Sequence, residues 1–176
     1  AIERFHGKSR TVRLDEALFA ALQELTRRSG VTLFMTLLAI FKALLLRYTG
    51  QTDVSVGSPI ANRNRREIEG VIGFFANTVV LRTDLGGDPS GGELLARVQE
   101  VTLGAYEHEI LPFEMLVEEL QPDRDMSRNP LFQVMCVLQN QPRSAVRAGE
   151  LAFSSLTVET ATAKFDLTMF WREVEG

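Results

Sequence analysis

Cysteine, histidine and tryptophan are scarce in this chain of 176 residues, which has one cysteine, two histidines and one tryptophan. Cys136 therefore cannot form an internal disulfide, and its apolar neighbours predict a small buried side chain. His6 and His108 lie far apart in the sequence, no set of residues has metal-ligand spacing, and no glycine-rich phosphate loop occurs. These absences argue against a disulfide scaffold, a metal centre and P-loop nucleotide chemistry.

Basic residues and long apolar runs are also in short supply. Lysine and arginine number 19 against 23 acidic residues, and the net charge of -4 argues against a general nucleic-acid or membrane-surface binder. The longest apolar run, residues 31–46, is interrupted by Thr32, Thr36 and Lys42 and is short for a bilayer span. The start of the chain lacks the pattern of a signal peptide. We expect a soluble, cytoplasmic protein with no nucleic-acid or membrane partner.

Apolar residues make up 45% of the chain, enough for one core, and their spacing alternates between helix and strand patterns. The helix patterns, with their capping residues, fall at residues 15–29, 32–48, 89–107 and 113–120. The strand patterns fall at residues 10–14, 53–57, 77–83, 131–138, 151–158 and 165–172. Residues 58–73 and 121–129 are expected to be loops, and residues 140–149 a polar connector.

The burial of these elements can be predicted from the same patterns. The helix at 32–48 is apolar on most sides, which is typical of a buried helix. The strand at 131–138 is apolar on both faces and should be internal to its sheet, and residues 77–83 form the clearest central strand. We find no internal repeat and no linker. The fold class expected is therefore α/β, a single layered domain with a mixed β-sheet flanked by helices.

Three strings of residues have no explanation in packing alone: IGFFANTVVLR at 72–82, HEILPFE at 108–114 and RDMSRNPLFQVM at 124–135. In this order and spacing they resemble three signature motifs of the condensation domains of nonribosomal peptide synthetases. The resemblance extends over essentially the whole chain and is strongest over residues 31–140. It implies a half of the chloramphenicol acetyltransferase-like fold, with residues 1–176 as the C-terminal, acceptor-side subdomain. We expect the chain to be an excised part of a longer protein.

The family's catalytic motif, His-His-x-x-x-Asp-Gly, belongs to its N-terminal half, and the chain has no two adjacent histidines. The resemblance therefore implies no catalytic residue and no metal ligand here, and a chain that is inactive by itself. Whole domains of the family join aminoacyl or peptidyl thioesters carried on the phosphopantetheine arms of carrier proteins, with no cofactor bound directly. The implied partners are the N-terminal subdomain, peptidyl carrier proteins and an adjacent adenylation domain. The alternatives are a non-catalytic carrier-binding or scaffold module, or half of an epimerisation or cyclisation relative.

The resemblance also implies roles for particular residues. We expect an exposed cleft wall formed by Ser58, Pro59, Asn77, Arg82 and Phe132, with Gln133 on the alternate face or at the edge. The substrate-binding residues implied are Ser58, Pro59, Asn77, Phe132 and Gln133. Arg82 is implied to pair with the aspartate of the missing N-terminal motif. Without that carboxylate, Arg82 is expected to be solvated, because a buried unpaired charge is costly.

Several residues have simpler structural interpretations beside the functional ones. His108 is expected to end a helix, where its charge favours the helix dipole, more than to act in catalysis. Asn77 is either a strand-end hydrogen-bonding residue or a residue near the substrate tunnel, and both interpretations stay open. The basic stretch 63–66 is more typical of a solvated loop than of a phosphate contact. Asp125, Ser127 and Arg128 are expected to lock a loop.

Two departures from the family pattern stand out. Ile110 replaces the usual acidic residue before Leu111 and Pro112, so a polar role there is in doubt. Gly91 and Gly92 replace an aromatic and a charged residue at the start of a helix, and two glycines weaken a first turn. Neither departure falls at the expected active centre.

Overall fold

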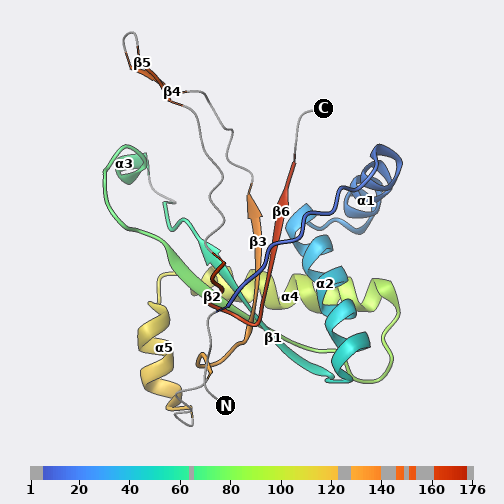
Figure 1. Cartoon of the computed structure of the whole chain (residues 1–176). Helices are drawn as coiled ribbons and strands as arrows, with labels where there is room; N and C mark the ends of the chain where they lie inside the picture. The colour runs from blue at the N-terminus through green and yellow to red at the C-terminus, as the bar shows by residue number, and fades with distance from the viewer. Residues whose placement is uncertain are drawn as a thin grey trace.

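A computed structural model of the chain describes residues 6–63, 66–122, 128–139, 146–148, 151–153 and 161–173 (Figure 1). Its helices are α1 (Glu16–Ser29), α2 (Leu33–Thr49), α3 (Arg66–Glu69), α4 (Gly91–Glu107) and α5 (Phe113–Leu120). Its strands are β1 (Asp53–Ile60), β2 (Asn77–Asp84), β3 (Val134–Gln139), β4 (Val146–Ala148), β5 (Leu151–Phe153) and β6 (Leu167–Arg172). The predicted roles of Asp125 and Ser127 lie outside the described residues, as do most of the 140–149 connector and the second half of the 151–158 strand.

Four of these strands form one mixed sheet in the order β2-β1-β3-β6, and β4 pairs with β5 in a separate ribbon. β1 and β2 are antiparallel, whereas β3 is parallel to both β1 and β6. The predicted α/β fold with a mixed, helix-flanked sheet is confirmed, and β3 is internal as predicted. The prediction that residues 77–83 form a central strand is wrong, because β2 lies at an edge of the sheet in the described part of the chain.

The core lies between the sheet and the helices α2 and α4, which pack against each other, α2 contacting β1 and α4 contacting β2 (Figure 1). Its buried residues come from α2, β1, β2 and the residue after it, α4 and β3: Met35, Leu38, Ala39, Phe41, Val54, Val56, Val79, Leu81, Leu85, Leu95, Val98 and Cys136. Cys136 is thus buried as predicted. No single helix in the described ranges is long and apolar enough to cross a membrane; α1 and α2 meet that test only as a pair bent by 107°.

The predicted caps define the helix ends. The Asp15 carboxylate accepts a hydrogen bond from the Leu18 N–H at 2.7 Å, and Gly30 ends α1 in the left-handed conformation. Thr32 and Gly50 do the same for α2. At α4, Ser90 forms a reciprocal capping box with Glu93, which offsets the predicted weakness of a first turn that begins with two glycines.

Other boundaries differ from the sequence-based expectation. Residues 10–14 form no strand, and β1 continues to Ile60, so the expected 58–73 loop contains the end of a strand and the short helix α3. β3 begins only at Val134, because Leu131 has a positive φ of 66° and the Phe132 N–H donates to the Pro130 carbonyl at 2.8 Å. This tight turn separates Phe132 from the strand.

Candidate functional site: the open face of the β1–β2 pair

The pleat of β1 and β2 sorts their side chains onto two faces. Val54, Val56, Leu81 and Thr83 are buried on the face covered by the helices. The alternate positions point to the opposite face, where charged residues stand next to one another at the end of the strand pair. Asp53 lies directly opposite Asp84, and Arg82 is the cross-strand partner of Ser55. The open face of the strand pair is therefore polar at this end.

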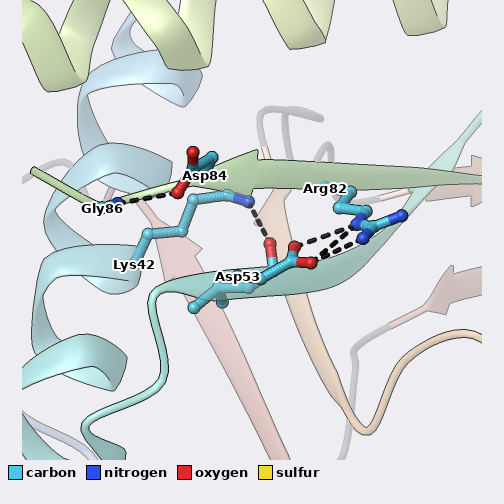
Figure 2. A network of polar contacts seen from close by, with 6 residues as sticks. Lys42, Asp53, Arg82, Asp84 and Gly86 are labelled. Atoms are coloured by element: carbon cyan, nitrogen blue, oxygen red, sulfur yellow. Dashed lines mark hydrogen bonds and ion pairs between the residues drawn. The ribbon is translucent and has the colours of Figure 1, made fainter.

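Asp53 and Arg82 form a bidentate ion pair across the two strands (Figure 2). The Arg82 Nε lies 2.9 Å from Oδ1 of Asp53, and Nη2 lies 2.6 Å from Oδ2. Hydrogen bonding from Arg82 holds the pKa of the Asp53 carboxyl below its ordinary value. The Arg82 side chain is 72% exposed, so the prediction that it is solvated is confirmed. The expectation that it lacks a carboxylate in this chain is wrong, because Asp53 provides one.

Asp84 takes a different partner from its neighbours on this face. Its carboxylate accepts the Gly86 N–H at 2.7 Å and is thereby turned toward the connection between β2 and α4. Asp53, Arg82 and Asp84 together line a surface hollow of about 490 Å³. Within the described part of the chain, this hollow is thus lined by one arginine, one carboxylate bound to it and one carboxylate bound elsewhere.

Lys42 of α2 lies on the other side of the same strand pair (Figure 2). It is fully buried, and its Nζ donates to the Val54 carbonyl at 3.0 Å and to the Leu81 carbonyl at 2.7 Å. These carbonyls belong to the residues next to Asp53 and Arg82. Burial lowers the pKa of the Lys42 ammonium to about 7, although the nearby Cys136 and Asp53 oppose this shift. Lys42 therefore joins β1 to β2 from the helix side.

Phe132 covers the middle of β1 on the open face. A side-chain carbon added at Gly57 would overlap the Phe132 ring, so only glycine lets the ring rest on this strand. The ring also contacts Phe113 of α5 and Phe165, with centroid distances of 5.6 and 5.4 Å. Phe132 is only 4% exposed. Its expected place on an exposed cleft wall is therefore wrong for this chain.

Asn77 acts as a hydrogen-bond hub at the start of β2. Its Nδ2 donates to the carbonyls of Glu109 and Leu111, both at 2.8 Å, and its Oδ1 accepts the N–H groups of Thr78 and Phe113. Both amide hydrogens and the carbonyl oxygen are thus used. This geometry favours the strand-end interpretation of Asn77, and it ties β2 to the start of α5.

A second surface hollow of about 240 Å³ adjoins this hub. Among its lining residues are Phe74, which is 92% exposed, and Ile110, which is 73% exposed. The second hollow is therefore more apolar than the first.

The remaining predicted site residues are scattered. Ser58 is buried, on the helix side of β1, so its expected exposure is wrong, whereas Pro59 is exposed. Gln133 is half-buried, and its side chain donates to the Asn129 carbonyl at 2.8 Å. The structure brings Arg82 and Phe132 onto the same face, since Gly57 lies two residues along β1 from Ser55, roughly 7 Å at the usual rise of a strand.

His108 and Arg63 both have structural roles in the described chain. His108 is the C-cap of α4, as predicted, and it is exposed. Within the basic stretch 63–66, residues 64 and 65 lie outside the described residues, and Arg63 is a half-buried loop residue and not a fully solvated one. Its guanidinium donates to the carbonyls of Ile68, Val71 and Gly73 and lies 4.5 Å from the centre of the Phe75 ring. Arg63 therefore holds together the segment that precedes β2.

Sequence reasoning missed both Asp53 and Lys42. A signal for Lys42 was available, because it is the only charge within the apolar stretch 33–46. Asp53 carried no such signal, since its pairing depends on the register of β1 against β2. No group of three or more His, Cys, Asp or Glu side chains arranged for a metal ion occurs within the described ranges.

Comparison with protein families assigns residues 1–176 to the model described as "Condensation domain". The chain belongs to the condensation-domain family. Its relatives include a linear gramicidin synthase of Brevibacillus parabrevis, 51% identical over 96% of this condensation-domain chain but only 3% of the relative. Chondramide synthase cmdD of Chondromyces crocatus is 47% identical over the whole chain and 4% of its own length. The condensation-domain chain thus spans a few per cent of the length of these relatives.

Solved structures agree with this assignment. A four-domain nonribosomal peptide synthetase bound to AMP and glycine superposes with a TM-score of 0.89 at 24% identity, over 99% of this chain and 14% of that one, which shows the shared fold. The complex of the X-domain and OxyB from teicoplanin biosynthesis gives a TM-score of 0.83 at 29% identity, over 100% of this chain and 38% of that one. The mixed sheet with its flanking helices is therefore that of condensation domains.

Proposed function

We propose that this chain is the C-terminal, acceptor-side half of a condensation domain that forms peptide bonds in nonribosomal peptide biosynthesis. The observation that carries the proposal is the family match over residues 1–176 in a chain whose histidines, His6 and His108, are far apart. A condensation reaction needs a group that manages a proton beside the attacking amine. The described residues at the open face of β1 and β2 include no neutral base suited to that task, so a second half would supply it.

The reaction joins two thioesters held on phosphopantetheine arms of carrier proteins. The acceptor amine attacks the donor carbonyl, the amine loses a proton, and the thiolate leaves with its carrier. Positioning of both arms and stabilisation of the developing oxyanion dominate such a reaction. In this proposal the chain provides one wall of the cleft and part of the acceptor-side surface. It binds no cofactor directly, and the arms belong to its substrates.

The predicted site residues take their places in this proposal with adjusted roles. Pro59 and Gln133 would face substrate most directly, since they are not fully covered in this chain. Ser58, Asn77 and Phe132 would shape the wall from within, as their burial and hydrogen bonds suggest. Arg82 would receive a carboxylate from the N-terminal half.

The partners in this proposal are that N-terminal half, two carrier proteins and an adjacent adenylation domain, all in the cytoplasm. The relatives named above are synthases of far greater length, which supports a multidomain setting.

The decisive experiment compares this chain with a longer polypeptide that adds an N-terminal condensation half. Each is incubated with two aminoacyl-loaded carrier proteins, and dipeptidyl-carrier product is measured by mass spectrometry. We expect product from the longer polypeptide and none above background from this chain. Carrier binding without product from the longer polypeptide would instead indicate a scaffold module. Epimerised or cyclised product would indicate one of the related reactions.

A further inference from the structure

The Asp53–Arg82 pair is built more rigidly than an ordinary surface ion pair. Both side chains extend from paired strands, and the guanidinium donates three hydrogen bonds to the carboxylate through Nε and Nη2, which fix its plane as well as its position. The backbone beneath is fixed too, because Lys42 binds the carbonyls of the adjacent residues, Val54 and Leu81. Arg82 is therefore anchored from both faces of the strand pair.

The anchored guanidinium still has binding capacity. Nε and Nη2 of Arg82 are used by Asp53, whereas Nη1 makes no hydrogen bond to any residue that the structure describes. Asp84, the other carboxylate in the hollow, is occupied by the Gly86 N–H. An arginine held on one side by a carboxylate presents a pre-oriented donor edge to a second acceptor.

We infer that Asp53 is a positioning residue: it holds Arg82 so that Nη1 meets an acceptor contributed by the other half of the domain across the cleft. This inference rests on the proposed function and extends it to a residue that touches neither substrate nor partner. Asp53 acts only through Arg82. Without the Asp53 carboxylate, Arg82 samples many rotamers, and the contact between Arg82 and the other half of the domain is no longer held in one geometry.

The pair contributes little to the stability of the chain itself. Exposed ion pairs are weak, because water screens the charges and both side chains lose freedom on pairing. A second exposed arginine–carboxylate pair provides a control. Arg27 and Glu24 on α1 form two hydrogen bonds, of 3.0 and 2.8 Å, and their side chains are 74% and 51% exposed, against 72% and 52% for Arg82 and Asp53. Both pairs join an arginine to a carboxylate at similar exposure, but Arg27 and Glu24 lie three residues apart on one helix, whereas Asp53 and Arg82 join two paired strands.

The test is a double-mutant cycle in the longer polypeptide that contains both halves. The variants are Asp53→Asn, Arg82→Ala, the double variant and the control Glu24→Gln, each assayed for dipeptide formation and thermal midpoint. Asp53→Asn should lower the rate about tenfold or more, as expected when a positioning contact is lost. The double variant should be no slower than Arg82→Ala alone. Glu24→Gln should retain the wild-type rate, and all midpoints should stay within about 4 °C of wild type.

Each contrary result has a distinct meaning. A wild-type polypeptide that forms no dipeptide overturns the proposed function, and this inference with it. An active wild type with a twofold or smaller effect of Asp53→Asn overturns the inference alone. So does a double variant that multiplies the two single losses, since Asp53 would then act independently of Arg82. A large fall in the thermal midpoint of Asp53→Asn would show a structural role instead.

Discussion

Lys42 is a charged residue in the middle of the core. Its Nζ lies in the fully buried layer between α2 and the sheet, where an ammonium loses the hydration that stabilises its charge. The two carbonyls of Val54 and Leu81 replace part of that hydration. The balance remains unfavourable to the charged form, so the pKa falls from its ordinary value of 10.5 to about 7. The protonation of Lys42, and with it the link between β1 and β2, should therefore depend on pH.

The free energy of unfolding should rise with pH from about 7 to about 8.5. In this window the unfolded chain keeps the Lys42 proton, since its pKa there is near 10.5, while the folded chain releases it near 7. Raising the pH therefore favours the folded state, by up to roughly 1.4 kcal/mol per unit. Above about 9 the trend should weaken, because burial raises the pKa of the Cys136 thiol to about 11 and favours thiolate formation in the unfolded chain. Urea melts at several pH values measure this slope.

Lys42→Met is the control for this pH effect. Methionine has a similar length and no charge, so the slope between pH 7 and 8.5 should flatten. An unchanged slope in Lys42→Met would assign the pH dependence to other groups.

Gly57 is the residue that lets Phe132 lie on β1. Gly57→Ala should lower the free energy of unfolding by about 1–3 kcal/mol, because the new methyl group overlaps the ring and forces the Phe113–Phe132–Phe165 cluster to move. Gly104→Ala is the matched control, since a side-chain carbon there meets nothing within 4 Å and lies inside α4. It should stabilise the chain by roughly 0.5–1 kcal/mol. Chemical denaturation of both variants provides the comparison, and equal effects would contradict the packing of Phe132 on Gly57.

At the scale of elements, helix α2 is the centre of the core. It contacts α1, α4 and β1, and its Leu38 is fully buried, whereas Ile40 is 42% exposed on the opposite side. Leu38→Ala should cost about 2–5 kcal/mol through lost burial and a residual cavity. Ile40→Ala removes a similar volume from a partly exposed site, so it should lower the free energy of unfolding far less. Thermal melts of the two variants separate these cases, and a similar loss in both would mean that α2 is packed on all sides.

How much of the fold the sequence predicts depends on whether the signal is local. Helix bounds were predicted well because caps such as Asp15, Thr32 and Ser90 act within one turn of the helix they begin. The order of the strands in the sheet was predicted poorly, because the apolar alternation of β2 is compatible with an edge or a central position. The alternation at 10–14 indicated a strand, yet a strand needs a partner, and these residues have none in the described sheet.

The candidate site shows the same division. The motif resemblance pointed to Arg82 and Phe132, since both lie within recognisable strings. The apolar patterns placed Arg82 correctly on a strand but placed Phe132 wrongly inside the strand predicted at 131–138. Their surroundings depend on contacts between distant segments. Asp53 reaches Arg82 only through the register of two strands, and Phe132 is buried only because a turn at Leu131 directs it onto Gly57. Lys42 is buried because two strand carbonyls lie within its reach.

At the scale of the whole molecule, the four-stranded sheet and the β4–β5 ribbon should differ in local stability. β1 and β3 are paired on both sides, and β1 is covered by core helices on one face, so their amides should exchange at rates close to those of global unfolding. β4 and β5 are three residues each and pair only with each other in the described chain (Figure 1). A two-stranded ribbon is marginal by itself. Hydrogen exchange should therefore be at least about a hundredfold faster in the ribbon than in β1 and β3. Ribbon amides as slow as those of β1 would show that the ribbon belongs to the same cooperative unit as the sheet.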